Sequence, residues 1–211
     1  MKKILACGFF WALCSSQSLA GVIYSNVTDF RAQLNSIVFD DYSNDAYEFI
    51  QSNAVMSAVL GETQYQSTGF NDLNVVTRGG TYCAGCNGSF ALNFESTSVS
   101  NGGGVYGFGF DFLNGGDTLY SALVTYADDT TELFALPRSF AFNDGSFDSF
   151  FGVTSTIGVR LVNIGIDGLS DVREGYFELD NLLIGNTQIP EPSIFILFLA
   201  GLLGSMRLSR K

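Results

Sequence analysis

The sequence predicts an all-β domain, either a sandwich or a barrel. From residue 70 onward, short runs rich in Phe, Val, Ile and Tyr alternate with Gly, Asn and Asp, which favour turns. Many short strands separated by such turns are typical of sandwiches and barrels. The predicted strands cover residues 70–77, 89–95, 104–113, 119–127, 131–136, 139–143, 147–153, 157–166 and 176–184.

The beginning of the body predicts less regular structure. Residues 22–24 predict a short strand, and a short helix follows from Asn26 with Phe30 on its apolar face. Residues 37–39 predict a further strand. The apolar side chains of residues 45–60 fit neither a helical nor a strand period, so this segment has no assignment.

Two later segments carry more detailed predictions. Residues 126–131 are the strongest candidate for a hairpin, because Asp128 and Asp129 separate two β runs. In the strand at 157–164, apolar side chains such as Val159 occupy every second position, which predicts one buried face. We interpret the two aspartates as turn residues rather than as ligands of an ion.

The N-terminus predicts a secretory signal peptide over residues 1–20. Two lysines precede an apolar run, and the segment ends in a small-x-small pattern at Ala20. Cleavage after Ala20 would leave Gly21 as the first residue. The segment that follows, residues 21–187, is therefore predicted to be exported, and its length is that of one domain with a sizeable core.

The C-terminal segment, residues 188–211, combines a helix-breaking motif, a short apolar run and a basic end. These parts are Pro190, Glu191 and Pro192, then residues 193–206, then residues 207–211. As a transmembrane helix the apolar run would rise only about 20 Å against roughly 30 Å of hydrocarbon, and the basic end favours the cytoplasmic side. The prolines leave an extended peptide that a processing enzyme can reach. Two interpretations are open: a sorting signal, which the pattern favours, and a tail anchor that is never cut.

The tail resembles the PEP-CTERM sorting domain, because Glu191 stands between two prolines ahead of the apolar run and the basic end. The body also resembles exported PEP-CTERM proteins over residues 83–90, 104–111, 150–155 and 177–182. This resemblance implies a jelly-roll-like β-sandwich and an exosortase-type processing enzyme as partner. It also implies inner-membrane anchoring through the C-terminal helix, then release to the cell surface or to an extracellular matrix of exopolysaccharide. The family is defined by this address, so it implies no activity.

Charge and composition exclude several classes of function. The body carries 20 acidic residues, five arginines and no lysine, so its net charge is near −15. Such a surface repels nucleic acid and anionic lipid. The chain has no histidine, which excludes Ser-His and Cys-His nucleophilic sites and all His-ligated metal centres. Carboxylate and thiol chemistry remain.

Cys83 and Cys86 are the two cysteines that remain after removal of the signal peptide. In an oxidising compartment a C-x-x-C pair is expected to form a disulfide that closes a tight loop. The alternative is a redox-active pair, which requires a βαβ context with the first cysteine at the start of a helix. Because Gly, Asn and Ser surround this pair between predicted strands, we expect a structural disulfide.

Asp40 and Asp180 are candidate ligands of a structural calcium ion. Asp40 ends an early predicted strand and Asp180 lies in the last one, and the first and last strands of many jelly rolls are neighbours. Backbone carbonyl oxygens would complete the shell of oxygen ligands that calcium prefers. The alternative is that both are solvated residues at strand ends.

The expected role is a non-enzymatic surface or matrix component that associates with exopolysaccharide. Two alternatives are open. A carboxylate-dependent glycoside hydrolase would pair Asp111 with Glu95 or Glu178. A carbohydrate-binding module would stack sugar rings on exposed aromatic side chains, and the mature chain has no tryptophan to offer. The tyrosines available for stacking are Tyr65, Tyr82, Tyr106, Tyr120 and Tyr176.

Overall fold

The computed structural model describes residues 21–68, 72–86, 88–100, 102–114, 119–137, 150–167, 171–172 and 177–187. Within them the chain is predominantly β-structure, which confirms the all-β prediction. The first elements are β1 (Val22–Tyr24), α1 (Val27–Arg31), β2 (Ser36–Asp40), β3 (Ile50–Gln51), α2 (Asn53–Ala58), β4 (Gln64–Ser67), β5 (Asn74–Val76) and β6 (Tyr82–Cys83). The later ones are β7 (Phe90–Asn93), β8 (Val105–Asn114), β9 (Ser121–Tyr126), β10 (Thr131–Ala135), β11 (Phe150–Asp167), β12 (Asp171–Val172) and β13 (Phe177–Asn186).

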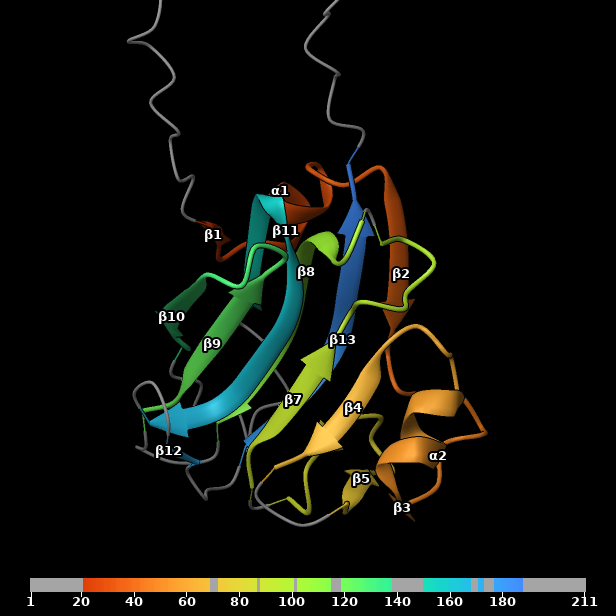
Figure 1. Cartoon of the computed structure of the whole chain (residues 1–211). Helices are drawn as coiled ribbons and strands as arrows, with labels where there is room; N and C mark the ends of the chain where they lie inside the picture. The colour runs from red at the N-terminus through yellow and green to blue at the C-terminus, as the bar shows by residue number, and fades with distance from the viewer. Residues whose placement is uncertain are drawn as a thin grey trace, which may run out of the picture.

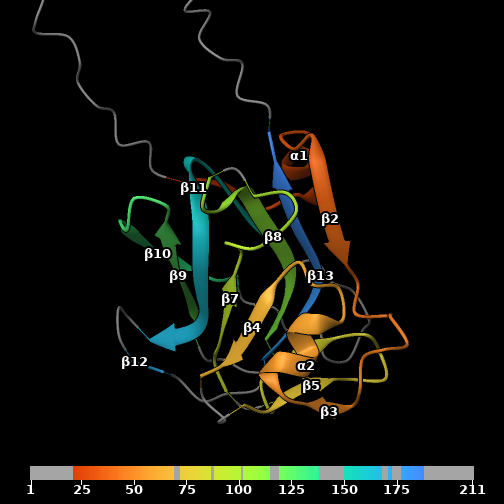
Figure 2. The ribbon, with the colours of Figure 1, turned by 45° about the vertical axis from the view of Figure 1, so that its right-hand side comes forward.

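The strands pair antiparallel in one continuous sheet that folds over into two layers (Figures 1 and 2). One layer contains β10, β9, the second half of β11, β7 and β4, and the other contains β1, the first half of β11, β8, β13, β2 and the β6–β5–β3 edge. Strand β11 joins the layers, because residues 150–154 pair with β8 and residues 159–166 pair with β9.

Strand β11 corrects two details of the sequence analysis. The predicted strands 147–153 and 157–166 are joined, because residues 150–167 form one strand of 18 residues. The pairing with β9 shifts register after Val159. Val159 is buried before this point, and Val162 and Ile164 are buried after it, so burial moves from odd-numbered to even-numbered positions. A simple alternation is therefore wrong across this point, since each irregularity inserts a residue and turns the following side chains to the other face.

Phenylalanine is the commonest residue in the core between the layers. Phe108, Phe110 and Phe112 alternate along β8 and are all buried, as expected for one face of a strand. The ring of Phe108 lies 6.0 Å from that of Phe94, which follows β7 in the opposite layer. Phe110 lies 5.7 Å from Phe151 of β11. The contact between Phe94 and Phe108 connects the two layers, and all of these rings belong to one continuous apolar core.

The predicted short helix is confirmed as α1. Its N-cap is Asn26, whose side chain accepts hydrogen bonds from two backbone N–H groups of the first turn. Phe30 is fully buried on the outer side of the β8–β11 pair. It packs there over glycines, since Cβ atoms at Gly107, Gly109 or Gly152 would lie within about 3.2 Å of its ring.

The predicted segments at the two ends of the chain, residues 1–20 and 188–211, lie outside the described residues. This includes the transmembrane segment predicted at 193–206. Among the residues that are described, no helix has both the length and the apolar character needed to cross a bilayer.

Candidate functional site

An open groove lies beside the β6–β5–β3 edge of the sheet. Its volume is about 440 Å³, within the roughly 300–1,000 Å³ typical of small-molecule sites. Two segments line it: residues 41–49, between β2 and β3, and residues 76–80, in the β5–β6 turn. We call it the 41–49 groove. Its aromatic lining residues are Tyr42, which is buried, Tyr47, which is half-buried, and Phe49, which is 62% exposed.

Polar side chains surround these rings. Asp41, Asn44 and Asp45 are exposed on the first segment, and Arg78 is exposed on the second. The side chain and backbone of Ser43 donate hydrogen bonds to Asp41 and lower the pKa of its carboxyl. Arg78 makes no ion pair with any described residue. The groove therefore offers an aromatic face together with carboxylate, amide and guanidinium groups.

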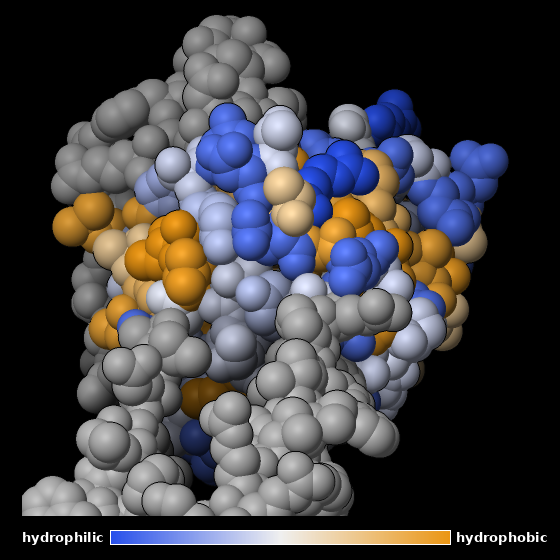
Figure 3. Space-filling view, turned by 90° about the horizontal axis from the view of Figure 1, so that it is seen from above, coloured by the Kyte–Doolittle hydropathy of each residue, from blue (hydrophilic) through white to orange (hydrophobic). Residues whose placement is uncertain are grey.

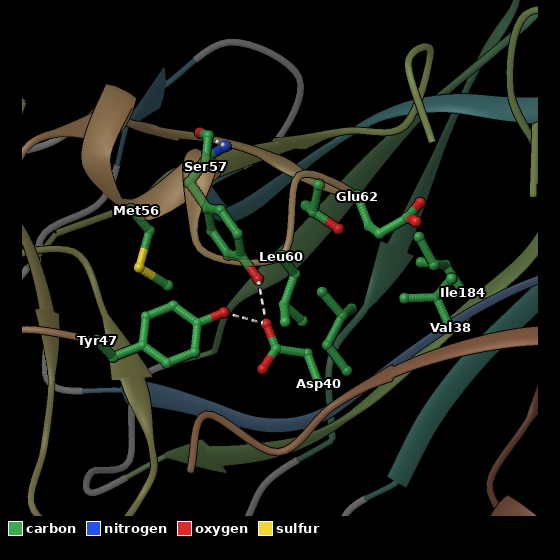
Figure 4. Close-up of a pocket in the computed structure, with 11 residues that line it drawn as sticks. Val38, Asp40, Tyr47, Met56, Ser57, Leu60, Glu62 and Ile184 are labelled. Carbon is green, nitrogen blue, oxygen red and sulfur yellow. Dashed lines mark hydrogen bonds between the residues drawn. The ribbon is translucent and has the colours of Figure 1, made fainter. Parts of the chain in front are cut away.

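Asp40 lies behind the groove and holds one of its walls. Figure 4 shows two tyrosine hydroxyls directed at this carboxylate. Tyr47 donates to Oδ2 at 2.5 Å, and the hydroxyl of Tyr65 lies 3.2 Å from the same oxygen, while the backbone N–H of Tyr42 donates to Oδ1 at 2.9 Å. Burial raises the pKa of Asp40, and the hydrogen bonds oppose that effect. Asp40 therefore fixes the position of Tyr47.

The pocket beside Asp40 is too small for a ligand. It is lined by Val38, Met56 and Ile184 among others, and its volume is about 10 Å³. That is the space of roughly one water molecule. The 41–49 groove is consequently the better candidate for ligand binding.

The two predicted calcium ligands lie on neighbouring strands. Asp40 pairs with Leu182 across β2 and β13, two residues from Asp180. Both oxygens of Asp40 accept hydrogen bonds, and the direct cross-strand neighbour of Asp180 is Asp111. At an irregularity in β13, Asn181 donates from its backbone to Asp180 at 2.6 Å and from its side chain to Asp111 at 2.8 Å. The calcium site of Asp40 and Asp180 stays a prediction.

The environment of Asp180 predicts a stability that depends on pH. Burial raises the pKa of Asp180 to about 6, and the charges of Asp111, Asp41 and Asp40 act in the same direction. A raised pKa means that the folded state binds the proton more tightly than the unfolded state, so the free energy of unfolding rises as the pH falls from 7 towards 4. With a discount for partial exposure, the gain is on the order of 1–2 kcal/mol.

Thermal unfolding at pH 7 and pH 5 in EDTA measures this effect. The wild type should melt at a higher temperature at pH 5, and Asp180→Asn should remove most of the difference. Asp128→Asn is the control. The hydroxyl and the backbone N–H of Thr130 donate hydrogen bonds to Asp128 and lower the pKa of its carboxyl, so this group titrates below the pH range of the experiment. An Asp180→Asn variant with the same pH dependence as the wild type would contradict the prediction.

Cys83 and Cys86 form a disulfide, as predicted. The turn between them places Gly85 and Cys86 at positive φ angles of 59° and 56°. Glu178 of β13 is close by, since its carboxylate and the two sulfurs lie within 4.8 Å of one another, and it accepts a hydrogen bond from the hydroxyl of Thr81. With the two sulfurs bonded to each other, the pair shapes this turn and offers no thiolate ligand.

The groove uses aromatic residues that the sequence analysis did not select. Three of the tyrosines predicted as sugar platforms are buried in the core. They are Tyr65, Tyr82 and Tyr120. Tyr106 is half-buried, and Tyr176 lies outside the described residues. Tyr47 and Phe49 belong to the unassigned segment 45–60, where the lack of a regular period was the one available sign of an exposed connection.

The carboxylates proposed for a hydrolase have different surroundings. Asp111 accepts a hydrogen bond from Asn181, Glu95 lies 3.7 Å from Arg160, and Glu178 is buried. None of the three lines the 41–49 groove. The carboxylates that do line the groove are Asp41 and Asp45.

Comparison of the chain with models of known protein families, with curated proteins and with solved structures finds no match. The residues of the predicted sorting motif, Pro190, Glu191 and Pro192, lie outside the described residues. The resemblance to PEP-CTERM proteins accordingly stays a prediction.

Proposed function

We propose that this chain is an exported surface or matrix protein that binds exopolysaccharide through the 41–49 groove. The observation that carries the proposal is the exposed ring of Phe49 and the half-buried ring of Tyr47 beside polar side chains in a groove of about 440 Å³. The apolar face of a sugar ring can stack on an aromatic ring. Its hydroxyls can bond to carboxylate, amide and guanidinium groups at the same time.

The charge of the groove favours a neutral glycan. Asp41 and Asp45 outnumber Arg78 among the charged lining residues, and the body as a whole carries a net charge near −15. An acidic polysaccharide or a nucleic acid would meet electrostatic repulsion from this surface. A neutral sugar chain meets none, and its hydroxyls can donate to both carboxylates.

Sorting at the membrane belongs to the same proposal. The signal peptide would export a jelly-roll-like sandwich, and the tail would anchor it in the inner membrane until an exosortase-type enzyme processes it. Strand β1 and the end of β13 lie at one end of the molecule, whereas β3 and β5 lie at the opposite end (Figure 1). An anchor that follows β13 would therefore leave the β3–β5 end, and with it the groove, directed away from the lipid.

Replacement of Phe49 tests the binding proposal. Phe49→Ala in the mature chain should weaken binding of a neutral exopolysaccharide by about tenfold, because loss of an aromatic contact of roughly 1–1.5 kcal/mol corresponds to that factor. Its stability should not change, since the ring is 62% exposed. The matched control is Phe39→Ala, which removes a ring that is 45% exposed on β2 outside the groove. Equal affinity of both variants and the wild type in calorimetric titration would contradict the proposal.

Two further measurements separate the remaining alternatives. Thermal unfolding in calcium and in EDTA tests the structural calcium that we propose at Asp40 and Asp180, because bound calcium should raise the melting temperature. Release of reducing sugar by the wild type, abolished in Asp111→Asn, would favour the hydrolase instead. We expect binding without any release of sugar.

A further inference from the structure

The first described residue is held by a carboxylate far away in the sequence. The backbone nitrogen of Gly21 donates to Oε2 of Glu132 at 3.0 Å. The same oxygen accepts a hydrogen bond from the hydroxyl of Tyr126 at 2.7 Å. Glu132 lies on β10 and Tyr126 ends β9, so the β9–β10 hairpin supplies both groups. Figure 3 views the molecule from the end at which β1 lies in Figure 1, and apolar and polar side chains are mixed on that face.

Gly21 is closely packed, and a larger residue at this position would require its neighbours to move. A Cβ atom on Gly21 would lie 2.7 Å from the hydroxyl oxygen of Tyr126 and 2.7 Å from a methyl carbon of Val153. It would also lie 3.2 Å from the ring of Phe134. Gly21 is thus both hydrogen-bonded through its backbone nitrogen and closely packed. It is also the residue that follows the predicted cleavage site at Ala20.

We propose that Glu132 and Tyr126 form a binding site for the new N-terminus that export creates. This inference rests on the proposed export of the chain. Hydrolysis of the bond between Ala20 and Gly21 consumes one water molecule, leaves a carboxylate on Ala20 and leaves a protonated amine on Gly21. The neutral N–H···O contact of the precursor then becomes an ammonium–carboxylate pair, which is shorter and stronger.

The groups that face this amine are negative or neutral. Glu132 supplies the carboxylate, and Asp128 in the adjoining turn adds a second negative charge close enough to affect Tyr126. Burial raises the pKa of Tyr126, so its hydroxyl stays protonated and donates to Glu132. Both carboxylates favour the ammonium form, and the pKa of the α-amine should rise above its ordinary value of about 7.7–8.0.

Docking of the amine would fix the short strand β1. This strand has three residues and pairs with β11, and two of its side chains, Val22 and Ile23, are more than half exposed. The charged pair with Glu132 would strengthen the existing connection between β1 and the β9–β10 hairpin. Processing would therefore complete the packing of the N-terminal strand and bury the end that the peptidase exposes.

The sequence offers a specific probe for this amine. After removal of residues 1–20, the amines of the chain are the α-amine of Gly21 and the side chain of Lys211. The full chain with its own signal peptide is expressed in an exporting bacterium, and the mature form is acetylated at a series of pH values. Trypsin releases residues 21–31, so mass spectrometry follows the α-amine separately from Lys211.

The α-amine of the wild type should show a pKa about one unit higher than that of Glu132→Gln, and at pH 8 it should react several-fold more slowly. Glu48→Gln, which removes an exposed carboxylate elsewhere, should behave as the wild type. Wild-type protein unfolded in urea supplies a reference that needs no substitution. Its amine should react as quickly as that of Glu132→Gln.

Two outcomes would overturn the inference. A mature chain that begins at a residue other than Gly21 removes its premise. Equal reactivity of the α-amine in folded wild type, unfolded wild type and Glu132→Gln shows that Glu132 does not bind it, although export would then stand. Glycan binding is measured in a separate experiment. If the protein binds no glycan, slow acetylation of the α-amine that depends on Glu132 would still support the N-terminal site.

Discussion

Phe108→Ala is expected to lower the free energy of unfolding by about 3–5 kcal/mol, the usual cost of removing a buried ring. Phe108 is fully buried on β8, and its ring lies 6.0 Å from Phe94 and 6.1 Å from both Phe110 and Phe151. These neighbours belong to both layers, so the cavity would open where the layers meet and where neither can close it alone. Urea unfolding followed by circular dichroism measures the loss.

Two matched variants accompany this measurement. Phe108→Leu keeps an apolar side chain at the same place and should cost roughly 1–2 kcal/mol. Phe39→Ala removes an exposed ring that contacts Arg31 and should change stability by about 1 kcal/mol or less. A Phe108→Ala variant as stable as Phe39→Ala would show that the two layers do not pack through this ring.

Asp40→Ala is expected to cost about 2–4 kcal/mol of stability and to weaken glycan binding as well. The substitution removes the acceptor of the hydroxyls of Tyr47 and Tyr65, and a buried donor without its partner costs about 1–3 kcal/mol. Tyr65 is buried, so its hydroxyl would keep only the hydroxyl of Tyr42, 3.2 Å away, as a partner. Tyr47 lines the groove, so the loss of its hydrogen bond should also reduce affinity.

Asp40→Asn separates the hydrogen bonds from the charge. The amide keeps one acceptor oxygen at the position of the carboxylate, so its cost should be smaller than that of alanine. The Tyr47→Phe variant lacks the hydroxyl that donates to Asp40. Asp40→Ala should therefore lower the free energy of unfolding less in this variant than in the wild type. Additive losses, with unchanged glycan affinity, would show that Asp40 does not position Tyr47.

The local features of the fold were predictable from the sequence. The hairpin around Asp128 and Asp129 is present as predicted, with β9 ending at Tyr126 and β10 beginning at Thr131. Residues close in sequence stabilise this turn, since the carboxylate of Asp128 accepts hydrogen bonds from the backbone N–H and the hydroxyl of Thr130. The α1 cap and the Cys83–Cys86 bridge are equally local, because each depends on residues within a few positions of one another.

The groove was not predictable in this way. Residues 45–60 form a connection, the two-residue strand β3 and the helix α2, which begins after the N-cap Ser52. Elements this short contain too few positions for a period to show. Burial of Met56 and exposure of Phe49 are decided by which side of the segment meets the sandwich.

The sequence predicts export signals at both ends and the exclusion of nucleic acid. By itself, it determined that the body is β-structure, where most long strands lie, and that the body carries a net charge near −15. These conclusions depend on composition and on neighbours along the chain. Only the tertiary structure decided that β11 bends between the layers, that Asp40 is enclosed by tyrosines, and that Gly21 meets Glu132. The reason is physical: such contacts join residues as many as 111 positions apart, and no local pattern records which strands lie side by side.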